Sequence, residues 1–427
     1  MNCKRITAVL LSAIVAFSVC VPAFGAEDAQ TLNTGVPVNE EEPASPESAD
    51  RSEEPALLEY ADGTEELASS ESAGGTEEPD IADLLEEPNA AEEQPDEEQA
   101  EQTEQLEEDR EAMSERAAGK SIAQAIWTQG DETLTFYYGP PVSSGKGFKG
   151  EIATRVWSGK DVTENVGEEP AWVDYLGYED NIVHIVFDDS FLSVKPTNTH
   201  AWFRHLWGLT DIDLGGLDTS EVTDMSRMFY DCDHLVSLDV SGFDTSNVIE
   251  MSEMFSYCTK LSSLDVGGFD TSNVNHINYM FEKCSNLSSL DVSGFDTSKV
   301  GKMKGMFDGC SSLTSLDLST FNTSKVGEMD YMFNGCSSLT SLDLSKFDTS
   351  NVINMEYMFA KCSGLTSLDV SGFDTSKVLY MGGMFSFLTL TSLDLSGFDT
   401  SELVVTDGMF RGCKNLKTIY CQDNRDV

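Results

Sequence analysis

Two series of aspartates could bind cations or basic partners, because each recurs at intervals of 26 residues, with a single interval of 25 near the end. The first series lies mostly in the motif L-D-V or L-D-L and is here named the LD ladder. Its members are Asp213, Asp239, Asp265, Asp291, Asp317, Asp343, Asp369 and Asp394. Each lies between two apolar residues, so in a strand its side chain points away from the face that buries those neighbours.

Adjacent LD-ladder carboxylates should repel one another. If the strands lie about 4.8 Å apart, two adjacent carboxylates repel each other by roughly 0.9 kcal/mol, even at the dielectric constant of water. Neighbouring Ser or Thr hydroxyls, solvent screening, divalent cations or a basic ligand would offset this repulsion. We therefore take the LD ladder as the candidate binding site.

The second series, the FD ladder, lies mostly in the motif F-D-T-S and has asparagine at one position. Its members are Asp218, Asp244, Asp270, Asp296, Asn322, Asp348, Asp374 and Asp399. Asparagine keeps the acceptor oxygen of aspartate but carries no charge. The substitution therefore predicts turn capping, in which the side chain accepts hydrogen bonds from the amides that follow it.

Six of the ten cysteines also recur every 26 residues, at Cys232, Cys258, Cys284, Cys310, Cys336 and Cys362. A disulfide ladder or a metal ladder is one interpretation, but leucine occupies the same repeat position at 206 and 388. A position that accepts leucine is apolar, and no C-x-x-C or Cys/His spacing indicates zinc. We predict buried free thiols, and Cys413 could pair with Cys421.

No motif indicates an enzyme. The five histidines are scattered without a nucleophile motif, and His205 lies among aromatic residues as a packing residue would. Residues 145–150 fit G-x-G-x-x-G, but the segment follows Pro-Pro-Val-Ser-Ser rather than a strand, so we interpret it as a loop. We expect no catalytic residue, no cofactor and no metal site.

The elements that position these residues follow from the repeat itself. Each unit begins with L-x-x-L-x-L, which is typical of a short strand. Its second half has apolar residues at i, i+3, i+4 and i+7, such as Ile277, Met280, Phe281 and Cys284, the spacing of one helix face. We predict an α/β fold over residues 209–427, a leucine-rich-repeat-like solenoid of 26-residue strand-turn-helix coils.

The N-terminal residues predict export. Residues 1–25 carry a basic start, an apolar run and small residues at 23 and 25, as a cleaved signal peptide does. Lipidation at Cys20 and an uncleaved signal anchor are the alternatives. We expect a secreted or cell-surface bacterial protein that does not insert into the membrane once its signal is cleaved.

Two further regions precede the repeats. Residues 26–116 are acidic and of low complexity, which predicts a disordered arm. Residues 117–208 hold all five tryptophans and alternating apolar runs, which predict a β-rich capping module with the tryptophans in its core rather than in a sugar-stacking platform. The net charge of −49 disfavours nucleic acid and anionic membranes as partners.

The repeat LTSLDLSKFDTSNVINMEYMFAKCSG, at residues 339–364, resembles the unit of the BspA-family leucine-rich repeat surface proteins. The lead-in segments at 181–191 and 201–214 are also similar to those of that family. The resemblance implies attachment to host extracellular proteins or bacterial surface proteins, and it carries no catalytic residues. The alternative is a structural coat or spacer protein without a specific ligand.

Overall fold

The computed structural model describes residues 121–158, 160–163, 170, 172–173 and 182–421. The predicted signal peptide at 1–25 and the predicted acidic arm at 26–116 lie outside these residues.

A five-stranded sheet precedes the repeats and continues into them. Its strands run in the order β5-β1-β2-β6-β7. Their bounds are β1 Ile122–Thr128, β2 Thr133–Gly139, β5 Arg155–Ser158, β6 His184–Phe187 and β7 Asp211–Asp213. The strand β1 is antiparallel to β2 and β5, whereas β6 is parallel to both β2 and β7. The sheet therefore changes from antiparallel to parallel pairing between β2 and β6, one strand before the repeats begin at β7.

Short elements complete this N-terminal part. The hairpin of β3 Gly147–Phe148 and β4 Glu151–Ile152 contains most of the G-x-G-x-x-G segment, which is therefore not a phosphate-binding turn before a helix. The α-helix α3 spans Lys160–Thr163, and the 3-10 helix η1 spans Asp189–Ser193.

The tryptophans of this part pack in its core. Trp127, Trp157, Trp172 and Trp202 are all buried, and the Trp172 indole N–H donates to the Trp202 carbonyl at 2.7 Å. The Phe136 ring stacks on Trp202 with centroids 5.3 Å apart. The core interpretation is confirmed for these four residues, which offer no exposed platform to a sugar.

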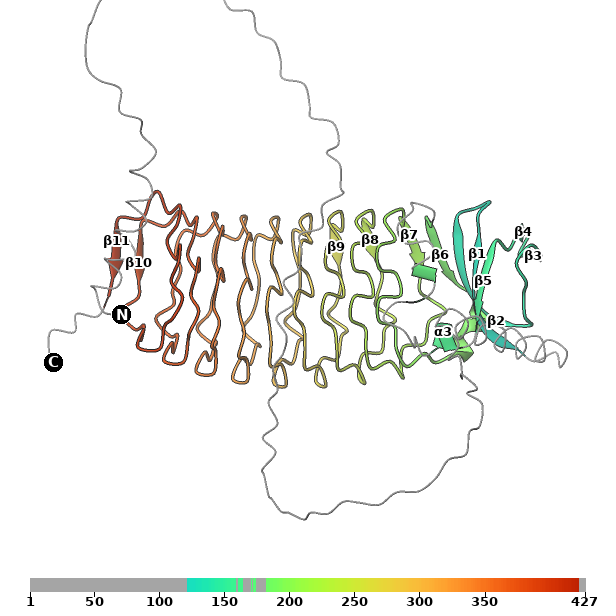
Figure 1. The fold of residues 1–427 in the computed structure, drawn as a ribbon, viewed down its shortest axis with the longest axis horizontal. Helices are drawn as coiled ribbons and strands as arrows, with labels where there is room; N and C mark the ends of the chain where they lie inside the picture. Colours follow the sequence, from blue (N-terminus) through green and yellow to red (C-terminus); the bar gives the residue numbers. More distant parts are fainter. Residues whose placement is uncertain (1–120, 159, 164–169, 171, 174–181, 422–427) are drawn as a thin grey trace, which may run out of the picture. The chain divides into compact units, whose positions relative to one another are not determined.

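Consecutive repeats stack as coils. Parallel β-bridges join residues one repeat apart, in an unbroken series from Asn198–Asp224 to Tyr380–Val405. The strands on the L-x-x-L-x-L side are short: β8 Ser237–Leu238, β9 Ser263–Leu264, β10 Ser392–Asp394 and β11 Thr418–Tyr420. Figure 1 shows these coils side by side from β7 to β11.

The predicted α/β class with strand-turn-helix coils is wrong. Across residues 209–421, all of which the structure describes, no residue lies in an α-helix or a 3-10 helix. In the second half of each coil, amides alternate between two kinds of acceptor. The Met228 N–H donates to Met225 of its own coil at 3.3 Å, whereas the Phe229 N–H donates to Met254 of the next coil at 2.9 Å. These segments are therefore chains of turns whose amides also donate hydrogen bonds to the next coil.

Backbone conformation explains why no helix forms. Two residues per coil, four positions apart, have positive φ, as at Glu253 (59°) and Tyr257 (60°). A residue in this left-handed region interrupts an α-helix and costs a non-glycine residue about 1–2 kcal/mol. The apolar spacing still works, because Met251, Met254, Phe255 and Cys258 are all fully buried. The helical spacing predicted the inward face correctly and the conformation wrongly.

Phenylalanines form a continuous column through the core. Seven successive ring pairs have centroids 5.7–6.1 Å apart and planes within 5–12° of parallel. The column consists of Phe229, Phe255, Phe281, Phe307, Phe333, Phe359, Phe385 and Phe410. Because no single coil encloses its apolar residues, contact between neighbouring coils creates the core.

Candidate functional site

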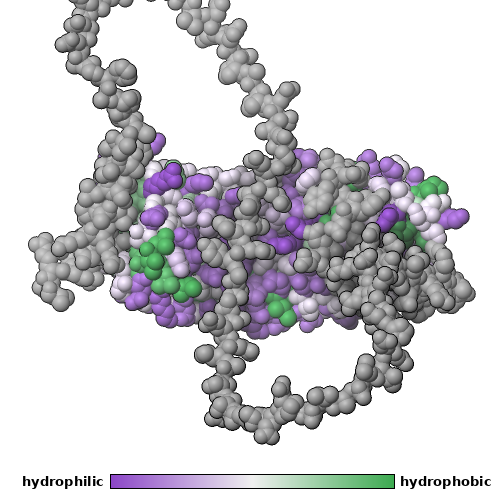
Figure 2. All heavy atoms as spheres, in the orientation of Figure 1, coloured by the Kyte–Doolittle hydropathy of each residue, from purple (hydrophilic) through white to green (hydrophobic). Residues whose placement is uncertain are grey.

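The LD ladder lies on the surface of the coils, on the side of the L-x-x-L-x-L segments. All eight aspartates are exposed. Figure 2 shows hydrophilic residues over much of the visible face, with an apolar patch near the C-terminal coils. Since the bridges keep successive coils in register, equivalent aspartates lie one strand spacing apart, about 4.8 Å.

Each LD-ladder aspartate also caps its own turn. In all eight, Oδ1 accepts the amide of the residue two positions on, at 2.9–3.0 Å. The sequence predicts capping for the FD ladder alone. The serine or glycine two residues after each LD-ladder aspartate was the signal that could have found it.

Hydrogen bonds favour the charged form of three carboxylates in the middle of the ladder. Those from Ser293 hold the pKa of Asp291 below its ordinary value, and those from Ser319 and Ser345 do the same for Asp317 and Asp343. Among the described residues, no basic side chain forms an ion pair with a member of the LD ladder. The ladder is therefore a row of eight exposed carboxylates that form no ion pair among the described residues.

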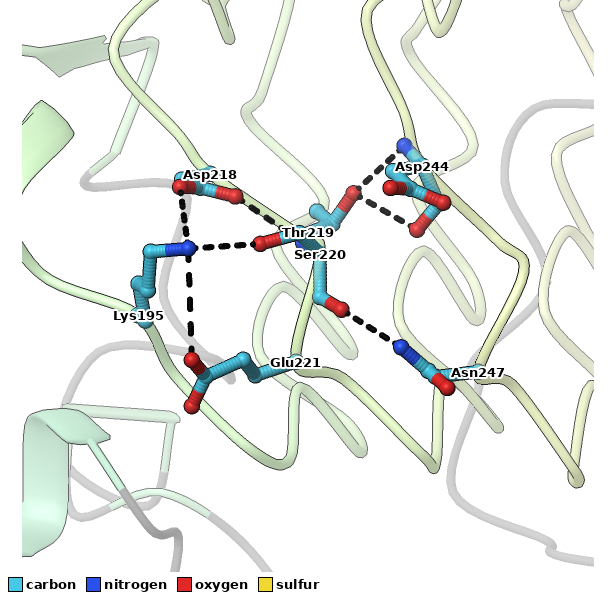
Figure 3. Close-up of polar contacts among 7 residues, drawn as sticks. All are labelled: Lys195, Asp218, Thr219, Ser220, Glu221, Asp244 and Asn247. Atoms are coloured by element: carbon cyan, nitrogen blue, oxygen red, sulfur yellow. Dashed lines mark hydrogen bonds and ion pairs between the residues drawn. The ribbon is translucent and has the colours of Figure 1, made fainter.

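The FD ladder caps turns as predicted. Each member, Asn322 included, accepts the amide two residues on at 2.9–3.1 Å. The threonine that follows each member from Asp218 to Asp374 connects neighbouring coils, a role that the sequence did not predict. The buried Thr219 hydroxyl donates to the Asp244 carbonyl at 3.1 Å and accepts the Asp244 amide at 2.8 Å (Figure 3).

A lysine pairs with the first member of the FD ladder. At its first member, Lys195 Nζ lies 3.4 Å from Asp218 and 3.9 Å from Glu221, and donates to the Ser220 hydroxyl at 3.1 Å (Figure 3). The Asn247 side-chain amide donates to the Ser220 carbonyl at 2.8 Å. Among the described residues only Asp218 of the FD ladder forms an ion pair, so the two ladders differ in the contacts between coils that the FD-ladder threonines make rather than in unpaired charge.

The six-cysteine series consists of buried free thiols, as predicted. Each Sγ donates to a phenylalanine carbonyl of the preceding coil at 2.9–3.1 Å, as in Cys284 to Phe255. The suggested pairing of Cys413 with Cys421 is wrong, because Cys413 is a free thiol that donates to Phe385 at 2.9 Å. Within the described part of the chain, no cluster of three or more His, Cys, Asp or Glu could hold a metal ion.

Two histidines contact acids of a neighbouring coil. His205 Nδ1 lies 3.0 Å from Asp231, and its ring packs against Trp207 and Tyr230. His276 Nδ1 lies 2.8 Å from Glu250 of the preceding coil. The packing role predicted for His205 agrees with this geometry.

A half-buried acid on the turn side of the coils gives a pH prediction. Burial raises the pKa of Glu282 to about 7, although the Ser256 hydroxyl donates to it at 2.9 Å. Because the pKa of Glu282 is higher in the folded state than in the unfolded chain, its ionised carboxylate lowers the free energy of unfolding above pH 7. This loss disappears as the pH falls toward about 4.5 and the carboxylate is protonated. We expect the free energy of unfolding to rise by about 1–3 kcal/mol over this interval because of Glu282.

The Glu282→Gln variant isolates this contribution from the nearby Asp308 and the histidines. Denaturant unfolding across pH 4.5–8 should show the variant to be more stable than the original protein at pH 8 and equal to it near pH 4.5. A stability difference that does not change with pH would contradict the prediction.

Stacked tandem repeats with an exposed acidic ladder define a repeat protein of the stacked-coil class. The model of the family described as "Mycoplasma protein of unknown function, DUF285" matches residues 197–315 and 302–422, together more than half of the chain. The chain belongs to this family. No curated protein and no solved structure gives a significant match. Among the described residues, no helix is long and apolar enough to cross a membrane.

Proposed function

We propose that this is an exported bacterial surface protein whose coils attach to a protein partner through the LD ladder. The observation that carries the proposal is the row of eight exposed carboxylates with no ion pair among the described residues. The resemblance of the repeat unit to the BspA-family surface proteins supports the location and the adhesive role. The signal-like residues 1–25 support export.

The electrostatics of the ladder favour a basic protein surface as the partner. Like charges about 4.8 Å apart repel one another, and cationic side chains placed between them would remove that repulsion. Exposed charges of this kind contribute mainly to association rate and specificity, and salt screens them. We therefore expect binding that weakens as ionic strength rises.

A charge-removing variant tests the site without disturbing the turns. Asn322 already caps its turn through Oδ1, at 3.1 Å from the Ser324 amide, so asparagine can replace a capping aspartate. In the triple variant Asp291→Asn, Asp317→Asn, Asp343→Asn, we expect about tenfold weaker binding and a smaller dependence on salt. Saturable binding to immobilised matrix proteins and to bacterial cells is the measurement.

The FD ladder provides a matched control. The triple variant Asp270→Asn, Asp296→Asn, Asp348→Asn removes the same charge from exposed turn-capping residues on another stripe of the same and the adjoining coils. Equal loss in both triples would show that net charge, not the LD ladder, governs binding. Absence of saturable binding to every partner would favour the coat or spacer alternative.

A further inference from the structure

Along the turn side of the coils, a stretch of seven residues sends all its backbone hydrogen bonds between coils in one direction. In one coil, four amides on alternate residues donate to carbonyls of the next coil at 2.7–3.0 Å, namely those of Met381, Gly383, Phe385 and Phe387. The same arrangement recurs at residues 199–205, 225–231, 251–257, 303–309, 329–335 and 355–361. The amides of this row therefore all point toward the C-terminal coils.

The equivalent amides of the last described coil lack such acceptors. They are the amides of Thr406, Gly408, Phe410 and Gly412, each 25 residues after its counterpart in the preceding coil. Within the described part of the chain, none of these four amides donates a hydrogen bond. Gly408 is exposed, and Thr406 and Gly412 are partly exposed, so a ligand can reach this edge. Unpaired amides in a row make a template for hydrogen bonding to another chain.

A second copy of this chain does not suit this edge. Its own last described coil presents amide donors, which cannot pair with donors. In its first coil, the Trp202 carbonyl corresponds to the Met228 carbonyl of the next coil, which accepts the Phe203 amide at 2.9 Å. The Trp172 indole N–H already donates to the Trp202 carbonyl at 2.7 Å. The acceptors that fit the edge therefore come from a different chain.

The charge of the edge favours an acidic ligand. Because the amides of the row are parallel, the positive ends of their peptide dipoles face outward at the last described coil. Arg411, Lys414 and Lys417 are exposed in this coil, and they form no ion pair among the described residues. Residues 403–421 contain these three basic residues and a single acid, Asp407, in a chain of net charge −49.

Exposed apolar side chains lie at both ends of the row of amides. Val404, two residues before Thr406, is 71% exposed. Phe387 is also exposed, and its ring lies against Gly412 at the other end of the row. A peptide that adds to an edge gains affinity from main-chain hydrogen bonds, and the side chains beside the edge contact its alternate residues.

We propose that the edge formed by the amides of residues 406–412 binds an extended acidic peptide segment of another protein. Alternate carbonyls of the peptide accept hydrogen bonds from the four amides, as the carbonyls of alternate residues 405–411 do for the preceding coil. Acidic side chains of the peptide lie near Arg411 and Lys414. The LD ladder is acidic and repels such a peptide, so this inference does not rest on the proposed function.

Titration of the full chain with a short fluorescent peptide of alternating Glu and Thr tests the proposal. We expect saturable binding that weakens as salt is added. The matched peptide with Gln in place of Glu should bind at least about tenfold more weakly, because it keeps the backbone acceptors but carries no charge. Lack of saturable binding of the Glu peptide would overturn the proposal.

Hydrogen exchange, resolved to single amides by fragmentation, locates the bound peptide. At saturating Glu peptide, the amides of Thr406, Gly408 and Gly412 should exchange at least about tenfold more slowly than in the free protein. The Gly383 amide already donates to the Asp407 carbonyl at 2.9 Å and should not change. Saturable binding without protection of residues 406–412 would place the peptide elsewhere and overturn the proposal.

Two matched double variants separate a local effect from one of net charge. Arg411→Glu with Lys414→Glu should weaken binding of the Glu peptide at least about tenfold. Lys325→Glu with Lys346→Glu makes the same change of charge at exposed residues of earlier coils and should leave the affinity nearly unchanged. Equal losses in the two variants would refute a site at the last described coil.

The LD-ladder triple variant distinguishes this inference from the proposed function. It should bind the Glu peptide at least as tightly as the original protein, because it removes negative charge far from the row of amides. Weaker binding of the Glu peptide by the triple variant would contradict the separate edge proposed here.

Discussion

Replacing Phe307 with alanine should lower the free energy of unfolding by about 3–5 kcal/mol. Phe307 is fully buried, and its ring stacks on Phe281 and Phe333 with both centroid distances at 5.9 Å. Alanine would leave a cavity between two rings that the neighbouring coils hold in place. Because each coil is stabilised only by its neighbours, a cavity in one coil should also weaken the coils on both sides of it.

Equilibrium denaturant unfolding measures this loss, and hydrogen exchange shows where it acts. Amides of the two coils that flank Phe307 should lose protection before those near the ends of the described coils. Phe387→Ala is a suitable control, since that ring is 44% exposed and its removal should change stability by less than about 1 kcal/mol. Equal effects of the two substitutions would show that the column is not what holds the coils together.

The six buried thiols should react with an alkylating reagent at least about a hundredfold more slowly in the native protein than after denaturation without reductant. Each is fully buried and bonded to a carbonyl of the preceding coil. Burial also raises the pKa of these thiols well above the ordinary value, as for Cys284, so little reactive thiolate is present.

Peptide-resolved mass spectrometry after timed alkylation distinguishes the individual cysteines. Cys413 serves as the internal comparison, because it is a free thiol that is only half buried and should be labelled first. Native labelling of Cys258 or Cys310 as fast as Cys413 would contradict the burial. Resistance to alkylation after denaturation would reveal disulfides in place of the free thiols.

The repeat in the sequence was sufficient to determine which residues face inward and which face outward. Apolar positions that recur every 26 residues must share one side of every coil, whatever the local conformation. The cysteine series accordingly lies inside the coils and the LD ladder outside. It also predicted that the FD ladder caps turns, since Asn322 retains the acceptor that capping needs.

Only the tertiary structure decided the conformation of the second half of each coil. The spacing i, i+3, i+4, i+7 suits a helix face, but a chain of turns also brings Met251, Met254 and Phe255 inward. The turns prevail because alternate amides, such as that of Phe255, donate to the next coil, at 3.0 Å from Met280. A helix would satisfy its amides internally and leave neighbouring coils without these bonds.

The contacts between coils also depend on stacking that no single repeat reveals. Residues 26 apart in the chain become neighbours in space only when the register of the bridges is known. The hydrogen bond from Thr219 to Asp244 and the ion pair between Lys304 and Asp330 both arise in this way. The sequence by itself determined which residues occupy each repeat position. The stacking register decided which side chains of one coil contact those of the next.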